Sequence, residues 1–152
     1  MKIVFAGECN VGKSSLIVRY FHKIFLNSYL PTLGKEIRPF RDIHICDLGG
    51  NSKDIIEDVD IAVLVFRADQ RKTFDALKKW NVQLKSKHVI VVANMCDLVR
   101  PVCSYFDLAT ELGWDYIETS AKSGLHVNFL FSKFINTTVK EEGWSAWVQN
   151  QI

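Results

Sequence analysis

Short apolar runs alternate along the chain with longer stretches in which apolar residues recur at helical spacing. Several of these runs are continuous, which is typical of strands that are buried on both faces of a sheet. We therefore expect strands at residues 2–6, 43–46, 60–66, 89–93 and 116–118.

The intervening stretches have the pattern of helices with one apolar face. The first helix is expected to begin at Lys13, and the third, 104–112, to have Ser104 as its N-cap and to end at Gly113. The second and fourth are marked by apolar stripes: Phe74, Leu77, Trp80 and Leu84, then Val127, Leu130, Phe131, Phe134 and Ile135. This alternation predicts an α/β fold of three layers, with a mostly parallel central sheet flanked by helices. In such sheets ligands bind beyond the carboxyl ends of the strands.

Length and composition indicate one globular domain. The 152 residues are 48% hydrophobic and 24% charged, and we assign 1–142 to this domain and 143–152 to a C-terminal tail. A formal net charge of +2 gives no reason to expect nucleic-acid binding. The longest apolar runs are too short for a membrane span. The four cysteines include no Cys-x-x-Cys pair, so we expect free thiols, no zinc site and a cytoplasmic location.

Residues 7–14, Gly-Glu-Cys-Asn-Val-Gly-Lys-Ser, match the phosphate-loop pattern G-x-x-x-x-G-K-[ST] without a mismatch. The glycines let successive backbone N–H groups point into one concavity, and the following helix adds its positive end. Lys13 supplies a cation for the terminal phosphates, and the Ser14 hydroxyl is a ligand for Mg²⁺. The residues expected to hold the phosphates are Gly7, Asn10, Val11, Gly12, Lys13, Ser14 and Ser15. A nucleoside triphosphate site is predicted, because the motif follows a strand and opens a helix.

Two later segments, each following a predicted strand, indicate that the base is guanine. Asn94 and Asp97 have the N-x-x-D spacing. A carboxylate in the plane of the base accepts from two donors that guanine carries and adenine lacks. Ser120, Ala121 and Lys122 follow the next strand, where a backbone N–H can meet the guanine carbonyl oxygen.

With these motifs the chain resembles the Ras superfamily of small GTPases, nearest the Rab and Ras branches, over residues 2–142. Glu118-Thr119-Ser120-Ala121-Lys122 matches the guanine loop of Rab proteins, and Phe25 to Thr32 resembles the first switch, with Thr32 at the family's spacing of 19 positions from Lys13. Asp47-Leu48-Gly49-Gly50 matches the D-x-x-G of the second switch, and its double glycine is closer to the Arf and Sar branch.

The resemblance implies the P-loop NTPase fold, bound GDP or GTP, and roles for individual residues. Phe25 would lie against the guanine ring, and Tyr29 would close over the phosphates. Thr32 would join Ser14 as a Mg²⁺ ligand, and Asp47 would lie near the metal through water. The Gly50 N–H would bind the γ-phosphate.

Three departures from the family concern catalysis and affinity. Asn51 stands where most members have glutamine, and its amide is one methylene shorter, so we expect Lys13, Gly50 and Asn51 to support only slow GTP hydrolysis. Met95 replaces the lysine of N-K-x-D, which predicts weaker nucleotide binding. Cys9 occupies a loop position near the γ-phosphate, where its side chain could crowd an incoming arginine.

The segments that usually engage partners are short. Only 14 residues separate Thr32 from Asp47, and at most a brief helix, Lys53–Val59, fits between Gly50 and the next strand. Protein effectors and regulators are expected, but their identity does not follow. The chain ends without a cysteine and has lysine at position 2, so no lipid anchor is expected unless the C-terminus is truncated. We expect a monomer.

Two other features are interpreted as structural and not as functional. Basic residues gather around the second predicted helix, and a solvated helix face is the simpler reading: Arg67, Arg71, Lys72, Lys78, Lys79, Lys85 and Lys87. Trp144 and Trp147 are expected to dock on the domain's own surface.

Three functions therefore compete. The first is a GTP-hydrolysing switch, and the second is a guanine-nucleotide-binding module with little or no hydrolysis. The third, a small phosphate-loop kinase acting on a metabolite, leaves Asn94, Asp97 and the segment 120–122 without a purpose.

Overall fold

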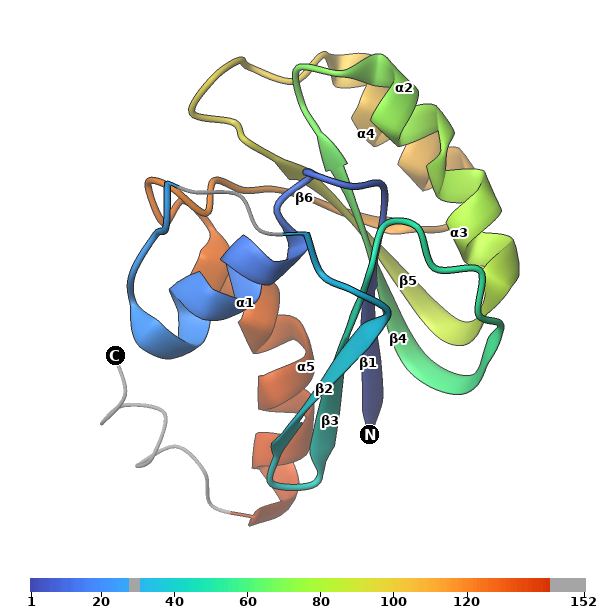
Figure 1. Ribbon diagram of the computed structural model, residues 1–152, viewed down its shortest axis with the longest axis vertical. Coiled ribbons are helices and arrows are strands. Elements are labelled where there is room, and N and C mark those ends of the chain that lie inside the picture. Colours follow the sequence, from blue (N-terminus) through green and yellow to red (C-terminus); the bar gives the residue numbers. More distant parts are fainter. Residues whose placement is uncertain (28–30, 143–152) are drawn as a thin grey trace.

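The computed structural model of the protein describes residues 1–27 and 31–142, so Tyr29 and the tryptophans at 144 and 147 lie outside the described residues. Figure 1 shows a central sheet with helices on both sides. In chain order the elements are β1 (Lys2–Ala6), α1 (Lys13–His22), β2 (Lys35–Phe40), β3 (Ile43–Leu48), β4 (Ile56–Arg67), α2 (Arg71–Asp75), α3 (Leu77–Gln83), β5 (Leu84–Asn94), α4 (Cys103–Glu111), β6 (Asp115–Glu118) and α5 (Val127–Glu142). The predicted three-layer α/β fold is confirmed.

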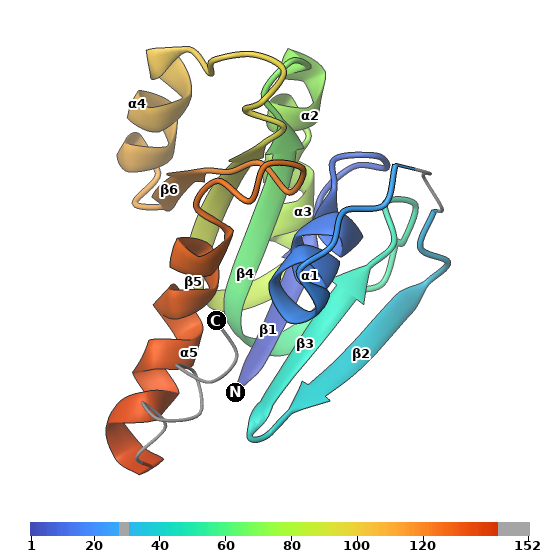
Figure 2. The ribbon, with the colours of Figure 1, turned by 90° about the vertical axis from the view of Figure 1, so that its left-hand side faces the viewer.

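The sheet has the strand order β2-β3-β1-β4-β5-β6, with β2 and β6 at its edges (Figure 2). Every neighbouring pair is parallel except β2 and β3, which form an antiparallel hairpin. Ala6 pairs with Leu64, and Arg67 pairs with Asn94. The carboxyl ends of the parallel strands therefore lie together at one end of the sheet. The loops that follow β1, β4, β5 and β6 therefore meet there.

Each face of the sheet has its own apolar core, because successive residues of a strand point to opposite faces. Phe5 faces α1 and α5, where it stacks on Phe131 with ring centroids 5.7 Å apart. Val4 and Ala6 face the other core, which contains Trp80 of α3. The continuous apolar runs are thus strands covered on both sides, as the pattern predicts. None of the helices in the described part of the chain is long and apolar enough to cross a membrane.

Several of the predicted elements need correction. The helix expected around 74–84 is two helices, α2 and α3, joined at Ala76. Helix α4 begins at Cys103 with Val102 in the N-cap position, so Ser104 lies inside the helix instead of capping it. The strands predicted at 60–66 and 89–93 are longer, since β4 and β5 run from Ile56–Arg67 and Leu84–Asn94.

No helix forms at Lys53–Val59, where the sequence leaves space for a brief one. Strand β4 already begins at Ile56, which pairs with Leu84. Ile56 and Val59 are both buried against the core around α3. A bulge between them places Asp58 at a φ of 57°, which a continuous helix does not contain. The segment from Gly50 to β4 is therefore a loop that leads directly into a strand.

Candidate nucleotide site

A cavity of about 650 Å³ opens at the carboxyl ends of the parallel strands. Most of the predicted site residues line it: Asn10, Gly12, Lys13, Ser14, Ser15, Phe25, Thr32, Gly50, Asn51, Asn94, Asp97, Ala121 and Lys122. The predicted residues Gly7, Val11, Asp47 and Ser120 lie behind this lining and are buried. Side chains that are distant in sequence thus meet at the carboxyl ends of the strands, where ligands bind in folds of this kind.

The phosphate loop passes from β1 to α1 with two glycines and one asparagine at positive φ: Gly7 at 150°, Asn10 at 61° and Gly12 at 94°. A Cβ atom at Gly12 would collide with the side-chain amide of Asn94, so only glycine fits there. Helix α1 begins at Lys13, as predicted.

Lys13 is buried, with 6% of the residue exposed, and its Nζ atom lies under the loop. It donates hydrogen bonds of 2.8 Å to the carbonyl oxygens of both Gly7 and Glu8. Burial lowers the pKa of Lys13, while the nearby Asp47 carboxylate acts in the opposite direction. The ammonium group is therefore held against the backbone that would cradle phosphates.

The three residues predicted at the Mg²⁺ site, Ser14 and Thr32 as ligands and Asp47 through water, lie together. The Ser14 hydroxyl is 2.8 Å from the Thr32 hydroxyl and donates a short hydrogen bond to Oδ2 of Asp47. Asp47 is fully buried, and its Oδ1 atom has no hydrogen-bond partner among the described residues. Burial raises the pKa of Asp47, and the hydrogen bond from Ser14 lowers it by a smaller amount. Hydroxyl and carboxylate oxygens with one buried oxygen left unpaired are a donor set that suits Mg²⁺.

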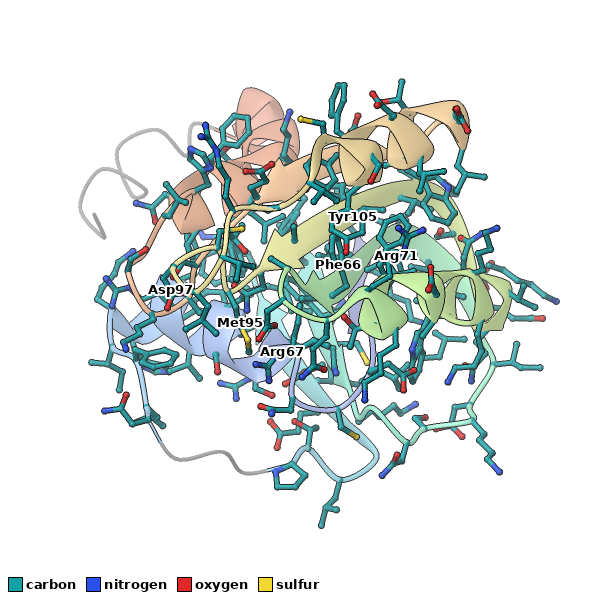
Figure 3. The ribbon with its side chains drawn as sticks, turned by 90° about the horizontal axis from the view of Figure 1, so that it is seen from above. Phe66, Arg67, Arg71, Met95, Asp97 and Tyr105 are labelled. Atoms are coloured by element: carbon teal, nitrogen blue, oxygen red, sulfur yellow. The ribbon has the colours of Figure 1, made fainter. Side chains whose placement is uncertain are left out.

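The segments predicted to read the base also meet. Ser120 donates a 2.7 Å hydrogen bond to Oδ1 of Asp97, and its hydroxyl accepts one from the Ser123 N–H. Asp97 is consequently fixed at the end of the cavity formed by the loops after β5 and β6. Figure 3, which looks onto this end of the molecule, shows Met95 between Asp97 and Arg67.

Asn94 contacts protein groups with both ends of its amide. Its Nδ2 donates to the Val11 carbonyl at 2.9 Å, and its Oδ1 accepts from the Thr119 hydroxyl at 3.1 Å and the Ala121 N–H at 3.3 Å. Asn94 therefore ties the phosphate loop to the segment after β6. These bonds give Asn94 a positioning role, and it also lines the cavity, where its contact with the nucleotide stays a prediction.

The second switch lies against the phosphate loop. A Cβ atom at Gly50 would overlap the backbone of Cys9, so this close approach requires glycine. The Cys9 Sγ atom donates to Oδ1 of Asn51 at 3.5 Å. Phe25, from the first switch, lines the cavity and packs against the core under α1.

Side chains from α3 and from the end of β4 contact the phosphate loop in ways that the sequence did not predict. The Glu8 carboxylate accepts hydrogen bonds from the buried indole of Trp80 and from Lys79, each 3.0 Å long. Arg67 does not belong to a solvated helix face, since it ends β4 and its side chain is only 15% exposed. Its guanidinium pairs with Asp69, which lowers the pKa of that carboxyl. The rule that ligands bind at strand ends could have singled out Arg67; nothing in the spacing pointed to Trp80.

Comparison with known proteins agrees with this geometry. The family model described as "Ras family" matches residues 2–47 and 49–140. The chain belongs to the Ras family. The family assignment covers the phosphate loop, both switches and the guanine-reading segments in one match.

Curated relatives of this family member include DnaJ homolog subfamily C member 27 from several vertebrates. The zebrafish (Danio rerio) protein is 29% identical over 90% of this chain, and the human (Homo sapiens) protein is 30% identical over 88%. The chicken (Gallus gallus) protein is 27% identical over 91%. The chain spans about 60% of the length of these relatives.

Proposed function

We propose that this chain is a guanine-nucleotide switch that binds GDP and GTP with Mg²⁺ and hydrolyses GTP slowly. The observation that supports this most is the shared cavity, in which Lys13 and Ser14 of the phosphate loop face the same space as Asp97. A phosphate site and a base-reading carboxylate on one cavity match the two ends of a nucleotide.

Base selection would rest on Asp97. Its carboxylate, held by the Ser120 hydroxyl at 2.7 Å, accepts from the two N–H donors on the Watson–Crick edge of guanine. Adenine presents no such pair, and its binding would leave the carboxylate desolvated without donors. Positioning by Ser120 reduces the conformational freedom that Asp97 loses on binding.

Magnesium would be held by Ser14 and Thr32, with Asp47 behind them. When bound, Mg²⁺ supplies positive charge to the terminal phosphate oxygens. Thr32 belongs to the first switch and Gly50 to the second, so the presence of the γ-phosphate would determine how both segments are held. Loops ordered by a γ-phosphate and released after its loss constitute a switch.

Hydrolysis needs a water molecule in line with the γ-phosphorus, so that its oxygen forms a bond as the bond to the β–γ bridging oxygen breaks. Lys13 offsets the negative charge of the terminal phosphates. Asn51 is the candidate for holding the water, but its amide is one methylene shorter than that of glutamine. An error of about 1 Å in such a position costs roughly a hundredfold in rate. Slow turnover follows.

Single-turnover phosphate release from GTP-loaded protein tests this proposal. We expect a slow natural rate, a rate at least about tenfold higher for Asn51→Gln, and nearly unchanged GTP affinity. Asn51→Ala is the matched control and should be slower than the natural protein. A natural rate above that of Asn51→Gln would show that Asn51 does not limit the reaction.

The same measurement distinguishes the second candidate, a guanine-nucleotide-binding module without hydrolysis. The contact between Cys9 and Asn51 favours this candidate, because it holds the amide against the loop. If natural protein and Asn51→Ala release phosphate at the same negligible rate while both retain GTP, the module is the correct description. A metabolite kinase is disfavoured, because the guanine-reading residues line the same cavity.

Partners are proposed to be proteins that contact the switches. Apolar side chains are exposed beside the cavity, on edge strand β2 and on the loop before β4. Among them are Leu33, 88% exposed, with Ile37 and Ile55. The names of the curated relatives refer to DnaJ homologues, and proteins associated with that system are the first candidates to test in a binding assay.

A further inference from the structure

Two residues at the ends of neighbouring strands donate hydrogen bonds to successive carbonyl groups of the phosphate loop. Arg67 ends β4 and Asn94 ends β5, and the two are paired in the sheet. Nη1 of Arg67 donates to the Asn10 carbonyl at 3.4 Å, and Nδ2 of Asn94 donates to the Val11 carbonyl at 2.9 Å. Met95, next after Asn94, places its Cε atom 3.8 Å from where a Cβ on Gly12 would lie.

Arg67 is held in a fixed orientation. Its Nε and Nη2 atoms donate to the two carboxylate oxygens of Asp69, each at 2.9 Å. This two-point contact fixes the plane of the guanidinium and directs Nη1 toward Asn10. The Arg67 backbone N–H also donates to the Thr73 hydroxyl at 2.9 Å, which anchors the strand end to α2.

A donor at the Asn10 carbonyl acts on the part of the loop that faces phosphates. The carbonyl of Asn10 and the N–H of Val11 belong to one peptide unit. A charged donor on the carbonyl polarises that unit and makes its N–H a better donor. Asn10 also has a positive φ of 61°, so its conformation is one that an external contact helps to maintain.

Met95 cannot provide such a contact, because a thioether has no N–H. A lysine at position 95 would extend over the same loop with an ammonium group at its end. We propose that Arg67 is a positioning residue for nucleotide binding. From the end of β4 it supplies a charged contact to the phosphate loop, which Met95, in the turn after β5, does not make. The inference rests on the proposed function, since it concerns the affinity of the same site for guanine nucleotides.

Dissociation of a fluorescent GDP analogue, chased with excess GDP at fixed Mg²⁺, tests the proposal in four proteins: natural, Arg67→Ala, Met95→Lys and the double variant. We expect Arg67→Ala to release the analogue about tenfold faster. Because Arg67 already makes the contact, the weaker binding that the sequence alone predicts from Met95 should not appear, and Met95→Lys should change the natural rate by less than about twofold. In the Arg67→Ala background it should restore most of the loss. A residue that only stabilised the fold would not be rescued by a lysine on another strand.

Arg71→Ala is the matched control. Arg71 also pairs with an aspartate, Asp75, at 3.1 Å and lies over the Phe74 and Tyr105 rings, away from the loop in Figure 3. Its replacement should leave the dissociation rate unchanged. If Arg67→Ala does not fold, Arg67→Gln, which keeps the stem and loses the charge, takes its place.

Two results would overturn the inference. One is an Arg67→Ala variant that releases the analogue at the same rate as the natural protein. The other is a slowing by Met95→Lys that is equal in both backgrounds. Failure of the natural protein to bind any guanine nucleotide is distinguishable from both, and would refute the proposed function together with this inference.

Discussion

The indole N–H of Trp80 donates a 3.0 Å hydrogen bond to the carboxylate of Glu8, which lies 72 residues earlier in the phosphate loop. Trp80 is fully buried between α3 and the sheet, so its N–H depends on this acceptor. The rigid core under α3 is thereby connected to the loop that would hold phosphate.

Removal of the acceptor should destabilise the protein. Glu8→Ala leaves the buried Trp80 N–H without a partner, which costs about 1–3 kcal/mol. Glu8→Gln keeps an amide oxygen for the indole and should lose less than about 1 kcal/mol. Urea unfolding followed by tryptophan fluorescence measures both variants. Equal stabilities for the two variants would contradict the importance of this hydrogen bond.

Asp47 should make the nucleotide-free protein sensitive to pH. Burial raises the pKa of this carboxyl in the folded state, so folding favours the protonated form. The stabilisation is complete below the unfolded-state pKa of about 3.9 and is lost as pH rises through the raised value. In EDTA at neutral pH, Asp47→Asn should therefore be more stable than the natural protein.

Urea unfolding of both proteins near pH 4 and pH 7, in EDTA and without nucleotide, checks this expectation. The difference in unfolding free energy should shrink at the lower pH. A difference that is the same at both values would show that the charge of Asp47 is not responsible.

The four cysteines should differ in reactivity in a way that reports on the cavity. Cys9 and Cys103 are exposed, and Cys46 is buried. Burial raises the pKa of Cys96 to about 11, so its thiolate is scarce at pH 8. Iodoacetamide should modify Cys9 and Cys103 first, and GDP with Mg²⁺ should protect Cys9 several-fold because it lines the cavity.

Cys103, the first residue of α4, is the internal control for this experiment. Its rate of modification, measured by mass spectrometry of peptides, should not change with nucleotide. Protection of both thiols, or of neither, would contradict the placement of the nucleotide against Cys9.

The local parts of the site were predictable from the sequence. Gly12 and Lys13 lie in a motif of eight consecutive residues, and α1 begins where that motif places it. Asp97 follows β5, whose apolar run is evident, and Ser120 follows the short strand β6. The position of such a residue is determined by the strand and the loop that follows it. The parallel register of the strands then brings these loops together at the carboxyl end of the sheet.

Contacts that depend on register and on helix orientation were not predictable. Arg67 reaches Asn10 because β4 extends one residue beyond the apolar run and pairs at its end with Asn94. The basic composition around it suggested a solvated helix instead. The sequence leaves space for a brief helix before β4. The strand begins there instead, because Ile56 is buried beside Leu84.

Competition binding with GDP, GTP, ADP and ATP tests the central claim, that the cavity selects guanine nucleotides through Asp97. We expect the natural protein to prefer both guanine nucleotides over both adenine nucleotides by at least about a hundredfold, as a site built around buried hydrogen bonds does. Asp97→Ala should remove most of this preference while keeping the fold. Equal affinity of the natural protein for guanine and adenine nucleotides would contradict the account.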